Sequence, residues 1–120
     1  YKATLVTGLA MERCKLALGG KAAFSLLEKK DLDRFEATPL DVGSVIDAIR
    51  EVSGTEVAIF LYPTGDNYKV SLRSKETVDV NRIARAFGGG GHVRAAGATS
   101  YERPETVIPK ILEMVREQLG

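Results

Sequence analysis

The stretch ARAFGGGGHVRAAGAT, from Ala84 to Thr99, carries the strongest signal in this chain of 120 residues. It holds four consecutive glycines, the only histidine, an arginine, and a run of alanine and glycine. Four adjacent glycines lose much conformational entropy on folding, and a flexible linker would not continue into histidine and arginine. The stretch therefore predicts a place where a ligand or another backbone comes too close to tolerate side chains.

A short helix is predicted immediately before the glycines. Asp79 is a favourable N-cap residue, and the residues after it place apolar side chains on one helical stripe. The stripe consists of Val80, Ile83, Ala84 and Phe87. Gly88 follows the helix where a left-handed residue commonly satisfies the last carbonyl groups. One glycine thus has a structural explanation, while Gly89, Gly90 and Gly91 have none.

The remaining segments alternate strand and helix patterns. Strands are predicted at 13–18 and 21–27, around a Gly-Gly turn, and at 55–62, 68–74 and 95–101. A short helical segment is predicted at 31–35, and a longer helix is predicted to begin at a cap at Asp41 and to end at Gly54. A last helix is predicted at 105–119, with Thr106 as its cap and Pro109 near its start. Residues 1–12 fit neither period. This order predicts a single α+β domain in which helices cover a small mixed β-sheet.

Composition restricts the class of protein. With 44% apolar and 28% charged residues, the chain is expected to be one globular domain with an ordinary core. Cys14 is the only cysteine, which excludes an internal disulfide and predicts a reducing, cytoplasmic location. No apolar run reaches the roughly 20 residues of a membrane span, and no signal peptide is visible. Because the chain begins at Tyr1, we expect it to be part of a longer protein.

Basic residues are concentrated around the glycines. The whole chain carries a formal net charge of +1, whereas residues 67–97 carry +4. The basic residues in this segment are Lys69, Arg73, Lys75, Arg82, Arg85 and Arg94. The local excess suits an anionic ligand, although a solvated face with a chance asymmetry gives the same pattern.

Polar groups on the strand at 68–74 are candidates for binding an anion. The period of two places Ser71 and Arg73 on one face, with Ser74 at the strand end. The planar guanidinium of Arg73 matches a phosphate group, and a serine hydroxyl can donate to another phosphate oxygen. An ordinary solvated strand face remains the alternative for this segment.

The glycine run offers a second candidate anion site. Exposed N–H groups of residues 89–91 can surround a phosphate, His92 can donate a hydrogen bond to it, and Arg94 adds fixed charge. Neither the P-loop pattern nor G-x-G-x-x-G is present. The alternative is a helix C-cap followed by a tight crossing of packed elements. The small residues at 95–97 support close packing under either interpretation.

The sequence contains no complete catalytic set. A single histidine without nearby paired carboxylates makes a poor metal site, and Cys14 lies in no recognisable motif. No nucleophile, base and orienting group occur together. From its residues alone, the chain is predicted to bind an anion or nucleotide and to have no catalytic or metal-binding residues of its own.

Two segments carry a resemblance to a known family. The segment FGGGGHVRAAGA resembles the G-G-G-H-x-x-A-A-G signature of the DHH-associated domain, the C-terminal domain of DHH-family phosphoesterases. VSLRSKETVDVNRIARAF is similar to the preceding segment in oligoribonucleases that degrade nanoRNA and have pAp phosphatase activity. DVGSVIDAIREVSGTEVAIFLY looks like the same subgroup. The resemblance covers roughly residues 15–119.

The resemblance implies which residues bind substrate. Gly89, Gly90, Gly91 and His92 would line the substrate site, with His92 reaching a phosphate. Arg73, between Ser71 and Ser74, matches the S-x-R-S of the family and would bind a phosphate or the terminal nucleotide. Arg94 occupies a variable position of the signature, and residues 95–97 complete it.

The resemblance also implies what this chain lacks. Family members carry an N-terminal domain with an Asp-His-His motif and two manganese ions, whereas this sequence has one histidine and no such motif. The whole chain, 1–120, is therefore expected to be the C-terminal substrate-binding domain of a cytoplasmic hydrolase, without a cofactor and inactive alone. The parent is expected to be an exonuclease that degrades short RNA or DNA oligonucleotides or dinucleotides. The resemblance also implies pAp phosphatase activity, and a homodimer is the expected assembly of the parent.

Two other interpretations remain open at the level of sequence. One is a nucleic-acid-binding module like the C-terminal domain of alanyl-tRNA synthetases, which has similar glycine and histidine residues and no hydrolase partner. The other is a structural or oligomerisation domain whose glycines serve packing. The S-x-R-S motif followed by TVDVN favours the oligoribonuclease group.

Overall fold

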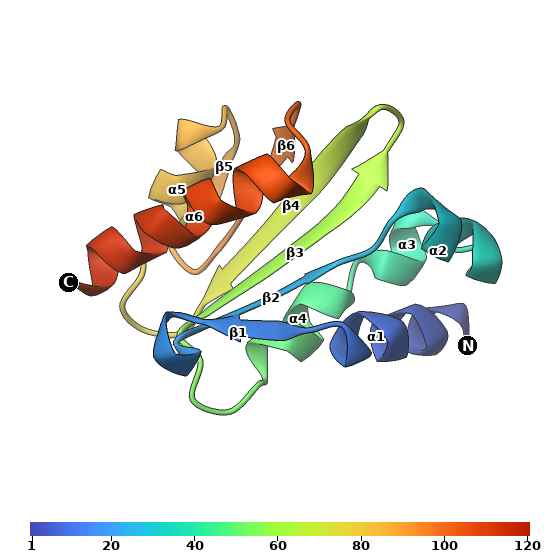
Figure 1. Ribbon diagram of the computed structural model, residues 1–120, viewed down its shortest axis with the longest axis horizontal. Coiled ribbons are helices and arrows are strands. Elements are labelled where there is room, and N and C mark those ends of the chain that lie inside the picture. Colours follow the sequence, from blue (N-terminus) through green and yellow to red (C-terminus); the bar gives the residue numbers. More distant parts are fainter.

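The computed structural model describes residues 1–120 as a six-stranded mixed sheet with helices on both faces (Figure 1). The first elements are α1 (Lys2–Glu12), β1 (Lys15–Ala17), the 3-10 turn η1 (Leu18–Gly20), β2 (Ala22–Leu26), α2 (Lys29–Phe35), α3 (Pro39–Val42) and α4 (Val45–Arg50). They are followed by β3 (Val57–Thr64), β4 (Asn67–Ser74), α5 (Val80–Ala86), β5 (Gly90–His92), β6 (Ala95–Ser100) and α6 (Pro104–Leu119). The predicted α+β class is confirmed.

The sheet has the strand order β1-β2-β3-β4-β6-β5. Strands β2 and β3 run parallel, and every other neighbouring pair is antiparallel. The chain therefore leaves the sheet between β2 and β3 through the helices α2, α3 and α4. The glycine-rich strand β5 lies at one edge, beside β6. A helix with the length and apolarity that a bilayer crossing requires does not occur in the structure.

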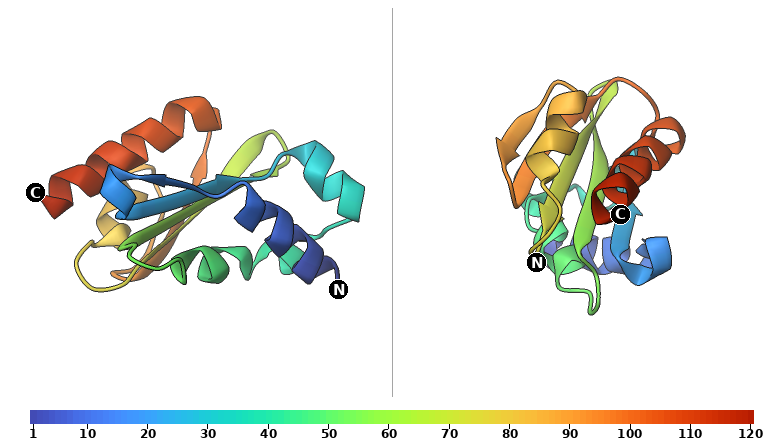
Figure 2. Two further views of the ribbon diagram at one scale, coloured as in Figure 1. Left: turned by 60° about the horizontal axis from the view of Figure 1, so that its bottom comes forward. Right: turned by 90° about the vertical axis from the view of Figure 1, so that its left-hand side faces the viewer.

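Two hydrophobic cores lie on the two faces of the sheet, as Figure 2 shows by placing α6 opposite α1 and α4. Large members of the core beneath α5 and α6 are Ile59, Leu61, Leu72, Ile83 and Ile111. Large members of the core beneath α1, α3 and α4 are Leu27, Ile46, Ile49 and Phe60. Because β3 contributes to both cores, its sequence is an almost continuous apolar run.

Strand β4 divides the sheet into a covered and an open part. Val70 and Leu72 of β4 belong to the core beneath α5 and α6. The alternation along a strand therefore turns Lys69, Ser71 and Arg73 toward the opposite, α4 side. Helix α4 packs on β2, β3 and β4, whereas β5 and β6 have their main helix contacts with α5. The polar face of β4 thus lies at the margin of the helix layer.

The start of the α3–α4 region differs from the sequence prediction. The predicted cap at Asp41 is wrong, because Thr38 is the N-cap of α3 and Asp41 is its third residue. The Asp41 carboxylate accepts a hydrogen bond from the Thr38 N–H at 2.7 Å, which completes a capping box. Pro39 supplies the first helical position, so the Thr-Pro start prevails over a start at Asp41. The helix is also interrupted before α4 begins at Val45.

The last helix also begins differently, and the first was not predicted. Arg103 is the N-cap of α6, so the predicted cap at Thr106 is wrong. Pro104 occupies the first helical position, where its missing N–H costs nothing, whereas the prediction that Pro109 lies near the start is wrong, because Pro109 lies inside the helix. Residues 2–12 form α1, which buries only Val6 and Ala10. Two buried residues one turn apart are too weak a pattern to reveal a helix.

Candidate functional site

The register of the sheet places Arg73 and His92 in line across β6, on the same face of the sheet. Arg73 of β4 pairs with Ala95 of β6, and Ala95 pairs in turn with His92 of β5. Because two antiparallel strand pairings lie between them, the Cα atoms of Arg73 and His92 are about 10 Å apart. His92 is exposed on the edge strand. Two residues that are distant in the sequence therefore lie on one face of the sheet, and their binding of a common ligand stays a prediction.

The Arg73 side chain is held in place but only partly engaged. Its Nε lies 3.4 Å from Oδ1 of Asp47 on α4, and its Nη1 donates to the Leu72 carbonyl at 3.0 Å. The side chain keeps 27% of its surface exposed. A guanidinium has five N–H donors, so these contacts leave donors free for an anion.

A hollow of about 300 Å³ opens beside Arg73. It is lined by Lys69, Ser71, Arg73, Gly90, Gly91, Ala95, Ala96 and Gly97. The side chains from β4 are polar or basic, whereas β5 and β6 contribute only glycine and alanine. The floor of this hollow, which we call the Arg73 hollow, is therefore nearly bare backbone.

Lys69 is a residue of the Arg73 hollow that the sequence indicated only as one of the basic residues of segment 67–97. A Cβ atom on Gly97 would lie 3.2 Å from the Lys69 Nζ and 3.1 Å from the Val70 carbonyl oxygen. The absence of a side chain at Gly97 therefore lets Lys69 lie across β6. Lys69 takes part in none of the ion pairs of the structure. Its charge adds to that of Arg73 at the same surface.

Close packing against β6 explains two of the glycines. A Cβ atom on Gly89 would lie 2.1 Å from the Gly97 carbonyl oxygen, and one on Gly91 would lie 2.6 Å from that of Ala95. Gly90 is different, because its Cβ atom would meet nothing closer than the Asn81 Oδ1 at 3.5 Å. The left-handed Gly88, at φ +82°, ends α5 as predicted.

The backbone donors of the glycine run are largely used within the chain. The Gly89 N–H donates to the Ala84 carbonyl at 2.9 Å. The Gly91 N–H donates to the Asn81 Oδ1 at 3.0 Å. These two groups are not free to surround an anion in the way that the sequence pattern suggested. What the glycines offer to a ligand is a surface without side chains, and Asn81 of α5 fixes its shape.

Ser74 and Arg94 lie in a network that holds the loop between β4 and α5. The buried Ser74 Oγ donates to the Val78 carbonyl at 2.6 Å. Arg94 Nη1 donates to the same carbonyl at 2.6 Å and to the Ser74 Oγ at 3.2 Å, and Nη2 donates to the Glu76 carbonyl. Neither residue lines the Arg73 hollow. A ligand-binding role for them stays a prediction, whereas their structural contacts are direct.

Glu56 fixes the same loop from the neighbouring segment. Its carboxylate accepts hydrogen bonds from the N–H groups of Glu76, Thr77 and Val78. Burial acts to raise the pKa of the Glu56 carboxyl, but the backbone hydrogen bonds outweigh it and the pKa is lowered. Asp79 caps α5 as predicted, because its side chain accepts from the Arg82 N–H. The Arg73 end of β4 is therefore followed by a well-anchored connection.

The structure has no cluster of metal-ligating side chains, and its only thiol, that of Cys14, lies between α1 and β1, away from the Arg73 hollow. The structure contains no group of three or more His, Cys, Asp or Glu side chains that would hold a metal ion. Cys14 is half-buried, and burial raises the pKa of its thiol, which disfavours the reactive thiolate.

Comparison with known proteins identifies the family. The DHHA1 domain family matches residues 17–120. The chain belongs to this family. A relative in Streptococcus mutans serotype c, named probable bifunctional oligoribonuclease and PAP phosphatase NrnA, is 33% identical over 106 residues. The match covers 88% of this chain and 34% of that relative. The chain spans 25–34% of the length of the curated relatives it matches, so this DHHA1 domain corresponds to one part of those proteins.

Solved structures share the fold of this DHHA1 domain. An exopolyphosphatase-related protein from Bacteroides fragilis superposes with a TM-score of 0.83 at 23% identity, covering 98% of this chain and 34% of that one. The C-Ala domain of Aquifex aeolicus alanyl-tRNA synthetase superposes with a TM-score of 0.58 at 16% identity, covering 82% of this chain and 89% of that one. At these identities the likeness concerns the fold.

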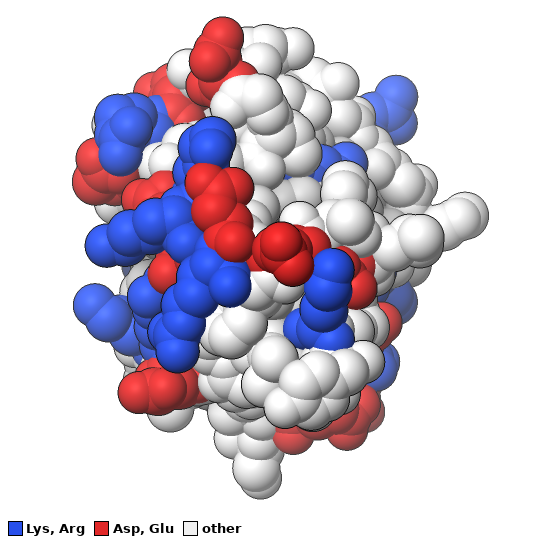
Figure 3. Space-filling view, turned by 90° about the vertical axis from the view of Figure 1, so that its right-hand side faces the viewer, with Lys and Arg blue, Asp and Glu red and all other residues white.

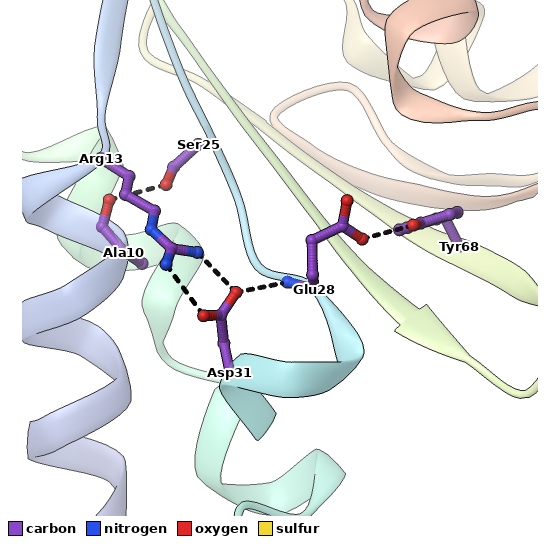
Figure 4. A network of polar contacts seen from close by, with 6 residues as sticks. All are labelled: Ala10, Arg13, Ser25, Glu28, Asp31 and Tyr68. Carbon is purple, nitrogen blue, oxygen red and sulfur yellow. Dashed lines mark hydrogen bonds and ion pairs between the residues drawn. The ribbon is translucent and has the colours of Figure 1, made fainter. Parts of the chain in front are cut away.

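A second polar cluster of the DHHA1 domain lies away from the Arg73 hollow (Figure 4). Arg13 donates two hydrogen bonds to the buried Asp31, at 2.5 and 2.8 Å, and Asp31 also accepts from the Glu28 N–H. The Glu28 carboxylate accepts from the Tyr68 hydroxyl, and Ser25 donates to the Ala10 carbonyl. These groups satisfy one another, and no buried side-chain polar atom of the domain lacks a partner. The cluster is a structural one that joins α1, β2, α2 and β4.

The end of the molecule near α2 and α3 carries many charges of both signs (Figure 3). Lys and Arg side chains gather there with Asp and Glu between them. The exposed Lys29 and Asp33 of α2, for example, form an ion pair at 2.7 Å. Mixed charges of this kind produce no extended field of one sign.

Proposed function

We propose that this DHHA1 domain binds the phosphate and adjoining nucleoside of a short oligonucleotide, a dinucleotide or pAp. The observation that carries the proposal is the Arg73 hollow, in which Lys69, Ser71 and Arg73 face a surface made of glycine and alanine. Cations and hydroxyl donors over bare backbone favour a ligand that combines negative charge with flat, bulky groups.

Each side chain would contribute a distinct interaction. The free N–H groups of Arg73 would donate to two oxygens of one phosphate, since a guanidinium matches that geometry. Ser71 would donate its hydroxyl to a neighbouring oxygen, and Lys69 would supply a second positive charge. His92, on the far side of Ala95, would donate to a further phosphate oxygen. Together these groups would fix the position of the chain end rather than carry out bond cleavage.

The hydrolytic step would belong to another part of a longer phosphoesterase. Relatives named oligoribonuclease and PAP phosphatase are three to four times as long as the match to this chain. The residues present here do not fit a pair of manganese ions, because no cluster of metal-ligating side chains exists in the structure. We therefore propose that the 120-residue chain binds substrate without cleaving it, and that the metal-dependent chemistry is supplied by an Asp-His-His domain.

Binding of pAp to the purified chain tests the proposal. Isothermal titration and amide NMR should detect binding, with shifts at Arg73, Gly90 and Gly97. Arg73→Ala should weaken binding at least about tenfold, because a hydrogen bond to a charged group contributes roughly 1.5–3 kcal/mol. Arg116→Ala is the matched control, since Arg116 lies on α6 at the opposite face. Equal affinities of the Arg73→Ala variant and the wild type would refute the proposed site.

A nucleic-acid-binding module is the second candidate, and the shared fold with the C-Ala domain is the observation that favours it. A module of that kind would prefer folded RNA to short oligonucleotides. Competition between a transfer RNA and a dinucleotide for the purified chain separates the two functions. Tighter binding of the transfer RNA, with no effect of Arg73→Ala, would support the module.

A further inference from the structure

A second hollow of about 300 Å³ adjoins the Arg73 hollow. It is lined by Lys69, Phe87, Gly88, Gly89, Gly97, Ala98, Thr99 and Tyr101. Lys69 and Gly97 line both hollows, so that the two are neighbours with the Lys69 side chain between them. The Arg73 hollow contains Arg73 and Ser71, whereas the second hollow, which we call the Tyr101 hollow, contains aromatic side chains and no arginine.

Tyr101 stands out on this surface because a large aromatic side chain is left 80% exposed. Its backbone is nevertheless fixed. The buried Ser100 Oγ donates to the Glu102 carbonyl at 2.8 Å and accepts from the Glu102 N–H at 3.1 Å. These two hydrogen bonds close a tight turn around Tyr101. The ring is therefore presented to solvent from a rigid base, at little entropic cost for binding.

The charges next to the Tyr101 hollow are arranged for an anionic ligand. Glu102, the acidic residue that follows Tyr101, is neutralised by Lys110, whose Nζ lies 2.9 Å from the carboxylate. Lys69 has no such partner and lies between the two hollows. A phosphate at the junction would meet the Lys69 ammonium, with the Arg73 guanidinium on one side and an aromatic ring on the other.

We infer that the Tyr101 hollow is a nucleobase subsite. The base of a nucleotide stacks on the Tyr101 ring, Lys69 contacts the phosphate that joins this unit to the next, and Arg73 binds the neighbouring phosphate. The inference rests on the proposed function and makes it more specific, because two adjoining subsites would prefer a dinucleotide to an isolated phosphate. Stacking also accounts for tolerance of base sequence, since every base has a flat face.

Two ligands and four variants, one of them Arg73→Ala, test the inference on the 120-residue chain. The ligands are the linear diadenylate pApA and inorganic pyrophosphate, which lacks a base. Tyr101→Ala should weaken pApA binding about 5- to 150-fold, the range expected for loss of one base–aromatic stack, and leave pyrophosphate binding unchanged. Tyr101→Phe should keep the pApA affinity because the ring remains. Tyr1→Ala, at a tyrosine that is 94% exposed, controls for the loss of an exposed ring.

The outcomes separate this inference from the proposed function. If Tyr101→Ala binds pApA as tightly as the wild type while Arg73→Ala binds it more weakly, the nucleobase subsite is overturned and the proposed function stands. No effect of Arg73→Ala, or no binding by the wild type, overturns both. Upfield shifts of the Tyr101 ring protons on addition of pApA, but not of pyrophosphate, would give direct support through the ring current of the stacked base.

Discussion

The Nε of Arg73 lies 3.4 Å from Oδ1 of Asp47, so the main cation of the hollow is held by a carboxylate from α4. Asp47 keeps 66% of its side-chain surface exposed, whereas Arg73 keeps 27%. The contact therefore ties the guanidinium to the α4 side of the hollow without burying the pair. Asp47 also places a negative charge beside the guanidinium that would bind a phosphate.

Removal of the Asp47 charge should strengthen anion binding. We expect Asp47→Asn to raise the affinity for pAp up to about fivefold, because exposed ion pairs contribute roughly 0–1 kcal/mol and the carboxylate competes with phosphate for Arg73. The gain should shrink as the salt concentration rises. Titration calorimetry at two salt concentrations measures both effects.

Asp33→Asn is the control for the change at Asp47. Asp33 pairs with Lys29 on α2, outside both hollows. The Asp33→Asn substitution removes the same charge from the chain as Asp47→Asn does. Its affinity for pAp should equal that of the wild type. Weaker binding by Asp47→Asn would show instead that the carboxylate is needed to orient Arg73.

The glycines should respond unequally to replacement by alanine. Gly89→Ala should lower the free energy of unfolding by about 1–3 kcal/mol or more, because its Cβ would lie 2.1 Å from the Gly97 carbonyl oxygen. Gly90→Ala should lower the free energy of unfolding by less, since its Cβ would make an ordinary contact with Asn81. Denaturant unfolding of the two variants gives the comparison. Equal destabilisation would contradict the packing explanation.

The sequence revealed the fold class and two residues of the Arg73 hollow because those features are local. Alternation along 68–74 identified the polar face of β4, and Asp79 and Gly88 identified the two ends of α5. Arg73 and Ser71 were recognised from that alternation, and the hollow contains both. These features depend on neighbours within a few residues, where periodicity and capping rules apply.

Other features depend on contacts between distant segments. Asp47 reaches Arg73 from another helix, and Asn81 binds the Gly91 N–H across the space between α5 and β5. Neither contact produces a periodic or motif-like pattern in the sequence. Lys69 was visible on the polar strand face, but only the register of β4 with β6 places it over Gly97. Conversely, the glycine N–H groups looked free in the sequence and are engaged in the structure.

Substitution of Arg94 should mainly lower stability, whereas substitution of Arg73 should mainly weaken pAp binding. Arg94→Ala removes hydrogen bonds to Ser74, Val78 and Glu76, so we expect a loss of about 1–3 kcal/mol in the free energy of unfolding. Arg73→Ala should change stability far less, because its ion pair with Asp47 is partly exposed. Thermal unfolding and pAp titration of both variants test this difference. A stable Arg94→Ala variant with weakened pAp binding would assign Arg94 to the ligand instead.

The Arg13–Asp31 pair should make stability depend on acid pH. The hydrogen bonds from Arg13 lower the pKa of the Asp31 carboxyl, burial opposes them, and the Glu28 N–H lowers the pKa further. Because the folded-state pKa lies below the unfolded value of about 3.9, the stabilisation is complete well above pH 4 and is lost as the pH falls through the folded-state pKa. Asp31→Asn should lower the free energy of unfolding by about 2 kcal/mol at pH 7, less than a fully buried pair would lose, because Arg13 is partly exposed. Below pH 4 the loss should become progressively smaller, because Asp31 is then protonated in the wild type as well. Urea unfolding between pH 7 and 3 measures the difference, with Asp33→Asn as the exposed control. Stability curves that stay parallel for Asp31→Asn and the wild type down to the lowest pH would refute the role of this pair.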